Sequence, residues 1–89
     1  MRIDKWLKVS RLIKRRSVAN EICDKNRIKI NNKIVKASAE VRVGDKVEIY
    51  LGETKIDLEI LKVPKDKENV SVQDSLELYR IINKLKLTE

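Results

Sequence analysis

The chain has 89 residues and a net charge of +7, and these values limit its size and its chemistry. This length is enough for one small domain, and 42% apolar residues with no Phe provide a modest core. One cysteine and no histidine exclude an internal disulfide and a recognisable metal site, and we expect no cofactor.

The start of the chain lacks the apolar stretch that follows the basic region of a signal peptide. No run approaches the ~20 apolar residues that cross a bilayer. We therefore expect a cytoplasmic protein that does not contact a membrane.

Positive charge is concentrated at the N-terminal end. The first 36 residues contain twelve Lys or Arg and three Asp or Glu, a net +9, whereas the remaining 53 residues carry −2. Clustered cations are typical of nucleic-acid binding, because neutralisation of phosphates dominates the affinity. An ordinary solvated face would mix both signs, but only Asp4 interrupts the cations of the first segment.

Residues 3–10 have the spacing of an amphipathic helix, with Ile3, Trp6 and Leu7 on one side and cations opposite. Trp6 has two interpretations, stacking on an RNA base or packing in the core, and its position beside Ile3 and Leu7 favours the core. Residues 11–16 follow as a loop or a single turn. Its three consecutive bases point in different directions, which suits a folded RNA.

A second helix is expected over residues 17–25. Ser17 is a suitable N-cap, and Asn26 is a plausible stop because Asn tolerates the left-handed conformation that ends helices. The buried stripe of this helix is expected to contain Val18, Ala19, Ile22 and Cys23.

Apolar and polar residues then alternate, which predicts short strands. Three or four short strands are expected among residues 27–30, 33–36, 40–43, 46–51 and 55–61. Asn31-Asn32, Gly44-Asp45 and Gly52-Glu53 are the expected turns.

The C-terminal part is expected to be a charged loop over residues 65–69 followed by a helix capped by Ser71. Leu78, Ile81, Ile82 and Leu85 have the i, i+3, i+4, i+7 spacing of a helical stripe. We expect this helix to pack on the strands, because a motif of about 50 residues buries little apolar surface. The alternative is that the stripe binds a protein partner.

The predicted fold is therefore α+β, with two N-terminal helices packed on a small, mostly antiparallel sheet and a C-terminal helix. Residues 1–50 form the expected RNA-binding motif, and residues 51–89 complete the same single domain.

Two basic helices followed by a small hairpin resemble the S4 RNA-binding domain family. Its motif has an Arg-apolar-Asp start, a basic bend, a second helix, an Asn at the hairpin turn and a closing Val-x-x-Gly-Asp run. The matching segments here, in the same order, are Arg2–Leu7, Arg11–Arg16, Ser17–Lys25, Ile28–Asn31 and Val41–Val47. Many members have Asn-Gly where this chain has Asn31-Asn32, so the turn is expected to be strained or longer.

Within that family, the run Arg2–Arg16 and the short length are most similar to the stand-alone ribosome-quality-control members. The resemblance implies a monomer that binds the rRNA of the large ribosomal subunit and a peptidyl-tRNA carrying a stalled chain. It also implies action beside an RqcH/NEMF-type protein, in support of C-terminal alanine tailing.

The residues expected to bind RNA are nine cations, and Asp4 is expected to orient one of them. These are Arg2, Lys5, Lys8, Arg11, Lys14, Arg15, Arg16, Arg27 and Lys29. Asp4 either contacts an RNA 2′-hydroxyl or pairs with Arg2 or Arg11, and we favour pairing.

Three alternatives remain open. A heat-shock-type member of the family would recycle large subunits without tailing, a protein-interaction adaptor would merely be localised by RNA, and an enzyme subunit would lend RNA affinity to another chain. The chain itself is not expected to be an enzyme, because it lacks histidine and clustered carboxylates and its cysteine lies in an apolar stripe.

Overall fold

The computed structural model describes residues 1–65 and 70–87, and it has the predicted α+β composition. The helices and strands, in chain order, are α1 (Ile3–Val9), α2 (Arg16–Asp24), β1 (Ile28–Ile30), β2 (Lys33–Ile34), β3 (Lys46–Leu51), β4 (Thr54–Ile60), α3 (Val72–Ser75) and β5 (Tyr79–Lys86). Among these described elements, no helix has the length and hydropathy needed to cross a membrane.

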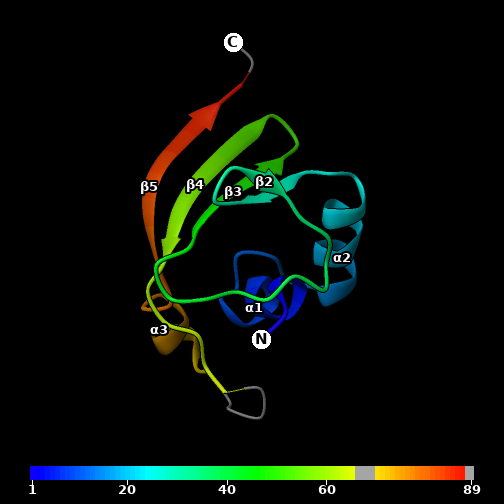
Figure 1. The fold of residues 1–89 in the computed structure, drawn as a ribbon. Helices are drawn as coiled ribbons and strands as arrows, with labels where there is room; N and C mark the ends of the chain where they lie inside the picture. Colours follow the sequence, from blue (N-terminus) through cyan, green and yellow to red (C-terminus); the bar gives the residue numbers. More distant parts are fainter. Residues whose placement is uncertain (66–69, 88–89) are drawn as a thin grey trace.

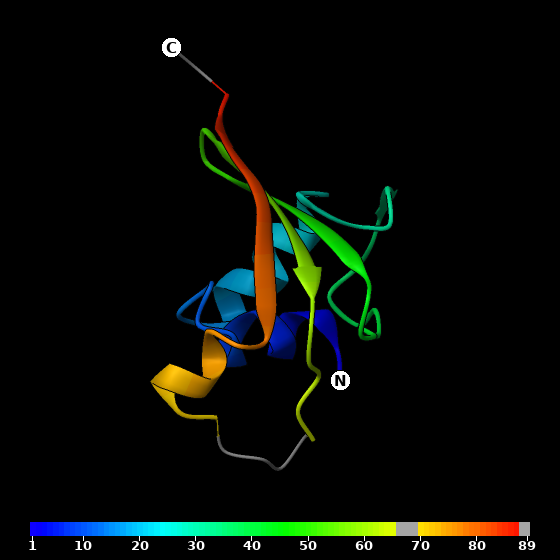
Figure 2. The same cartoon turned by 90° about the vertical axis from the view of Figure 1, so that its left-hand side faces the viewer.

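The strands form one antiparallel sheet in the order β2-β1-β3-β4-β5. Helices α1 and α2 lie on the same side of this sheet, while β2 and β5 are its two outer strands (Figure 1). A view turned by 90° shows β5 running along one edge, with the short helix α3 below it (Figure 2). The expected antiparallel arrangement is confirmed.

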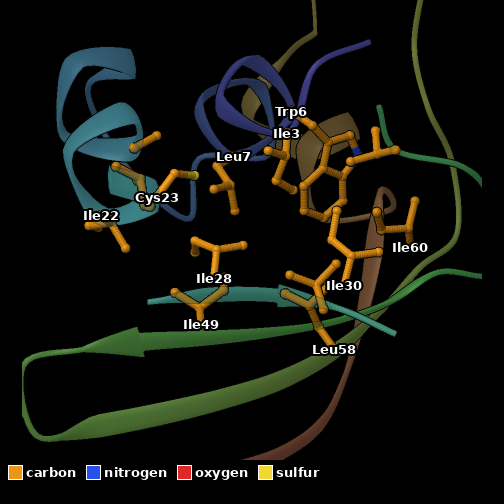
Figure 3. Packing of buried hydrophobic residues seen from close by; sticks show 14 of the residues in the cluster. Ile3, Trp6, Leu7, Ile22, Cys23, Ile28, Ile30, Ile49, Leu58 and Ile60 are labelled. Atoms are coloured by element: carbon orange, nitrogen blue, oxygen red, sulfur yellow. The ribbon is translucent and has the colours of Figure 1, made fainter. Parts of the chain in front are cut away.

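The core lies between the two helices and the inner face of the sheet (Figure 3). Alternation along β3 and β4 directs every second side chain inward, so that Ile49 and Leu58 are fully buried while their neighbours face outward. Trp6 from α1 is also fully buried, and its indole N–H donates to the carbonyl of Lys62 at 3.1 Å. The expectation that Trp6 packs in the core is confirmed.

Helix α2 begins one residue earlier than predicted. Its N-cap is Arg15, in an extended conformation and without a side-chain capping bond, so Ser17 lies in the first turn and is not the cap. Val18 faces solvent with 40% exposure, whereas Ala19 and Cys23 are fully buried. The predicted stripe was therefore one residue too wide.

The helix stop and the first hairpin follow the prediction, because Asn provides the required backbone conformation. Asn26 has φ 60° after α2, and Asn31 and Asn32 have φ 50° and 69° in a two-residue turn between β1 and β2. The Asn31 side chain donates to Asp45 and accepts from the N–H of Lys46, both at 3.0 Å. These bonds hold the turn against the start of β3, so the second Asn does not lengthen it.

The prediction of a strand over residues 40–43 was wrong. Only Glu40 bridges Arg2, and the remainder of the segment has no strand partner among the described residues. Val41 is buried but Val43 is 66% exposed. The alternation of polar and apolar residues in this segment therefore belongs to a loop, of which Val41 packs in the core.

The prediction of a long C-terminal helix was also wrong. Ser71 caps a helix as predicted, accepting from the N–H of Asp74 at 3.0 Å, but this helix, α3, ends at Ser75. The following chain forms β5, which pairs with β4 from Tyr79 to Lys86 with one register shift, opposite Asp57 and Leu58. Pairing with β5 satisfies the outward backbone groups of β4, which a helix at this position would leave unpaired, and this explains why the local helical spacing did not decide the conformation. The loop expected over residues 65–69 lies almost entirely outside the described residues.

Replacing Trp6 with Ala should lower the free energy of unfolding by about 3–5 kcal/mol, because it removes the largest fully buried side chain and leaves a cavity. Urea denaturation measures the loss. Val43→Ala is the matched control at an exposed position, with an expected change within about 0.5 kcal/mol. A well-folded Trp6→Ala protein that fails to bind RNA would instead favour base stacking.

Candidate nucleic-acid interface

A buried carboxylate, that of Asp4, lies at the centre of the basic N-terminal region. Asp4 is only 2% exposed. One oxygen accepts the backbone N–H of Lys5 at 2.8 Å, and the guanidinium groups of Arg2 and Arg16 each approach the carboxylate to 3.3 Å. The amide of Asn20 completes the set at 3.5 Å. Asp4 therefore holds two arginines in place.

The positions of Asp4 and Arg16 at the beginnings of two helices explain this arrangement. Asp4 lies in the first turn of α1, where free backbone N–H groups favour a carboxylate, and Arg16 lies in the first turn of α2. The loop at residues 37–39 ties down the start of α1, because Ile3 donates to the carbonyl of Ala39 at 2.7 Å. The beginnings of both helices thus meet around one carboxylate.

The charge state of Asp4 follows from these contacts. Burial by itself raises the pKa of a carboxyl group. The hydrogen bond and charge of Arg16, the N–H of Lys5 and the charge of Arg2 outweigh burial and lower the pKa of Asp4 below its usual value. Asp4 is therefore ionised at neutral pH, and it remains an acceptor for both arginines.

The surface above Asp4 is a shallow open depression. It is lined by Arg2, Asp4, Arg16, Ser17 and Asn20. The side chains of Arg2 and Arg16 are each 45% exposed, so each guanidinium keeps donors directed to solvent while it is oriented from behind. Oriented arginines of this kind suit phosphate oxygens, which accept paired N–H bonds.

Sequence reasoning identified part of this arrangement and missed part. The preferred pairing of Asp4 with Arg2 is present, but the second partner is Arg16 and not Arg11. Ser17 and Asn20 were missed as lining residues. The i, i+4 spacing of Arg16 and Asn20 places both on one face of α2, and this was the available signal.

The other predicted cations of the helical region are not among the residues that line this depression. Lys8, Lys14 and Arg15 are exposed on α1 and on the turn before α2. Lys5 is half-buried. Arg11 has a left-handed backbone with φ 64°, and its guanidinium donates to the carbonyl of Val70 at 3.2 Å. Arg11 therefore binds the C-terminal half of the protein while remaining exposed.

Arg27 and Lys29 do not lie beside the depression. Arg27 lines a separate hollow together with α2 residues and the β3–β4 turn. Lys29 alternates with buried Ile28 and Ile30, so it faces the side of the sheet opposite the helices. There it approaches Glu48 at 4.0 Å, a surface pair of small energetic value.

The cysteine has the properties of a core residue. Cys23 is fully buried, and burial together with the charges of Asp4 and Asp24 raises the pKa of its thiol to about 11. A thiol in this state is a poor nucleophile at neutral pH. Among the described residues, no cluster of His, Cys, Asp or Glu has the geometry to hold a metal ion.

Comparison with known proteins gives consistent results for sequence and structure. The S4 domain family matches residues 1–47. A protein named RQC P-site tRNA stabilizing factor from Streptococcus pneumoniae is 44% identical over all of this chain and 98% of its own length. A protein of the same name from Bacillus subtilis is 38% identical over the full length of both. The trimeric structure of Vibrio cholerae heat shock protein 15 superposes with a TM-score of 0.81 at 26% identity, covering 91% of this chain and 80% of that one.

Asp4→Asn should lower the free energy of unfolding by about 1.5–3 kcal/mol at pH 7, because the charge-assisted bonds to Arg2 and Arg16 are removed. The lowered pKa means that this contribution is complete above the pKa of an unfolded Asp and disappears as the pH falls through the folded value. Urea titrations at pH 7 and near pH 2.5 should therefore show the difference from wild type shrinking in acid.

The control for this prediction is Asp24→Asn, which removes the same charge from an exposed position on α2. Its stability should follow that of wild type at both pH values. An Asp4→Asn protein as stable as wild type at pH 7 would contradict the assigned role of the carboxylate.

Proposed function

The chain belongs to the S4-domain family, together with the relatives named RQC P-site tRNA stabilizing factor, and we propose that it stabilises a P-site tRNA during ribosome quality control. The observation that carries this proposal is identity of 38–44% across the full chain to relatives of that name. The similarity includes both the basic helices and the C-terminal strands. The similarity to these relatives therefore extends beyond the S4 segment at residues 1–47.

The proposed mechanism is binding without catalysis. The guanidinium groups of Arg2 and Arg16, oriented by Asp4, would bind phosphates of structured RNA, and exposed Lys8, Lys14 and Arg15 would extend the contact. Phosphate and shape recognition suit rRNA and tRNA, because the deep, narrow major groove of their helical regions keeps side chains from the base edges there. With no histidine in the chain and the single thiol buried, the molecule would position RNA and carry out no chemistry on it.

The finer steps are part of the same proposal. We infer that the protein binds an obstructed large subunit, contacts rRNA and peptidyl-tRNA together, and keeps the tRNA in place for alanine tailing. An RqcH/NEMF-type protein on the same subunit would supply the alanyl-tRNA. The chain would act as a monomer there.

A second candidate is supported by the similarity to heat shock protein 15. In that case the protein would recycle large subunits carrying nascent chain–tRNA, without a role in tailing. The two candidates differ in a measurable product. Removal of the protein should shorten or abolish C-terminal alanine tails in the first case and leave them unchanged in the second.

The ionic strength dependence of RNA binding provides the first test. If about five cations contact phosphates, the logarithm of affinity for a structured tRNA should fall against the logarithm of salt concentration with a slope of order −4. Fluorescence anisotropy at several salt concentrations measures this slope. A slope near zero would contradict phosphate-dominated binding.

Lys14→Ala combined with Arg15→Ala should weaken binding to large subunits carrying peptidyl-tRNA, by about 1–2 kcal/mol for each phosphate bond that a removed side chain would have made. The melting temperature should be nearly unchanged because both side chains are exposed. Co-sedimentation with such subunits and the length of alanine tails are the measurements.

The control is Lys84→Ala with Lys86→Ala, which removes equal charge from β5 on the opposite end of the sheet from β1 and β2. This variant should bind subunits almost as well as wild type. Equal weakening by both pairs of substitutions would show that net charge, and not the helical face, determines the affinity.

A further inference from the structure

Strand β5 forms a long outer edge of the sheet. Of its eight residues, all but Ile82 pair with β4 on one side, and no strand among residues 1–65 and 70–87 pairs with the other side. Figure 1 shows this edge as the orange-to-red strand at the border of the sheet, and Figure 2 shows it facing the viewer. Such an edge is a template for a further strand.

The backbone direction at this edge follows from two hydrogen bonds to the β4 side. The N–H of Leu87 donates to the carbonyl of Glu53 at 2.6 Å, and the carbonyl of Leu78 accepts from Leu61 at 2.8 Å. Backbone groups alternate in direction along an antiparallel strand, but the register shift between Asp57 and Leu58 leaves Ile82 as an extra residue and reverses the alternation there. The directions at residues 83–87 are therefore set by Leu87. The N–H and C=O groups of Lys84 and Lys86 therefore point away from β4.

Apolar side chains of β5 and of the residue after it, Leu87, are exposed. The exposed fractions are 43% for Ile81, 47% for Ile82, 46% for Leu85 and 52% for Leu87. The helices do not cover them, since the buried core cluster includes no residue beyond Leu78. Of the four residues with helical spacing in the sequence, Leu78 is buried in the core, whereas Ile81, Ile82 and Leu85 remain available for a partner.

The charge of β5 indicates which kind of partner could bind at its free edge. Residues Tyr79–Lys86 include Arg80, Lys84 and Lys86 and no acidic residue. A second copy pairing along the same edge would bring like charges together, which is unfavourable between neighbouring strands. A phosphate backbone would match the charge, but it has no apolar groups to cover Ile81 and Leu85. An acidic and apolar protein segment matches both properties.

We propose that the free edge of β5 is a docking site for an extended protein segment that alternates acidic and apolar residues. The segment would add a sixth strand, with backbone bonds to Lys84 and Lys86, apolar contacts to the exposed side chains and ion pairs to the two ammonium groups. This mode of binding takes its affinity from the main chain and its selectivity from alternate side chains. The site lies on a different element from the proposed RNA-binding helices.

The test uses a labelled soluble peptide that alternates Glu with Val, together with a second peptide in which Lys replaces each Glu. Titration into the full-length protein, followed by amide NMR, should shift and protect the backbone of residues 79–87 with the Glu peptide. The Lys peptide should bind at least about tenfold more weakly, because its charges oppose those of the strand.

Two variants separate the backbone from the charge contribution. Lys84→Pro removes one outward N–H and should abolish peptide binding, while an edge strand tolerates the change. Lys84→Glu with Lys86→Glu keeps the N–H groups and should reverse the preference toward the Lys peptide. Both variants should retain RNA affinity within about twofold at a salt concentration that screens distant charges.

Three results would overturn the proposal. They are absence of peptide binding by the wild-type protein, concentration-dependent dimerisation that Lys84→Pro prevents, and shifts of residues 79–87 by an RNA oligonucleotide in place of the Glu peptide. Sedimentation equilibrium detects the second result, and the same NMR titration detects the other two.

Discussion

The buried carboxylate of Asp4 is the interaction on which the arrangement of the basic region depends. Helices α1 and α2 contain seven and nine residues, lengths at which isolated helices are unstable in water. Each is held by its apolar face on the sheet, and Asp4 connects their beginnings through Arg2 and Arg16. The same contacts that order the helices orient the guanidinium groups, so stability and the presentation of charge are coupled.

The two faces of the sheet use charge differently. On the face opposite the helices, Lys55 lies between Glu48 and Asp57 at 3.6 and 3.7 Å, and Lys29 approaches Glu48. These cations are balanced by neighbouring carboxylates. The cations of α1 and of the turn before α2 have one buried acid, Asp4, in their segment. This segment therefore carries a net positive charge, which suits the phosphate binding that we propose for it.

The C-terminal strand has consequences for both stability and binding. By pairing with β4, it covers the edge that β4 would otherwise expose, and it brings Tyr79 against Trp6 with ring centroids 6.3 Å apart. The indole N–H of Trp6 reaches Lys62 just beyond β4. Thus the first helix and the last strand share one aromatic contact, although they lie at opposite ends of the chain. Completion of the sheet leaves a new edge at β5 with exposed apolar groups.

Features that depend on local chemistry could be predicted from the amino-acid sequence. Clustered cations predicted the class of ligand, helical spacing placed Trp6 in the core, and Asn26, Asn31 and Asn32 marked positions with positive φ. Each of these follows from neighbouring residues, and so did the Arg-apolar-Asp run that led to the family. Pairing of Asp4 with Arg2 could also be predicted from neighbouring residues, since the two lie close together at the start of α1.

Features that depend on distant partners required the three-dimensional arrangement. Arg16 replaces Arg11 beside Asp4 because the two helices meet at their beginnings, and Lys29 faces away because β1 lies within the sheet and directs its neighbours inward. Residues 79–86 have a helical pattern but form a strand, since β4 offers backbone groups that a short helix cannot satisfy. A local pattern limits which side chains share a face, whereas a hydrogen-bonding partner far along the chain decides which conformation the backbone adopts.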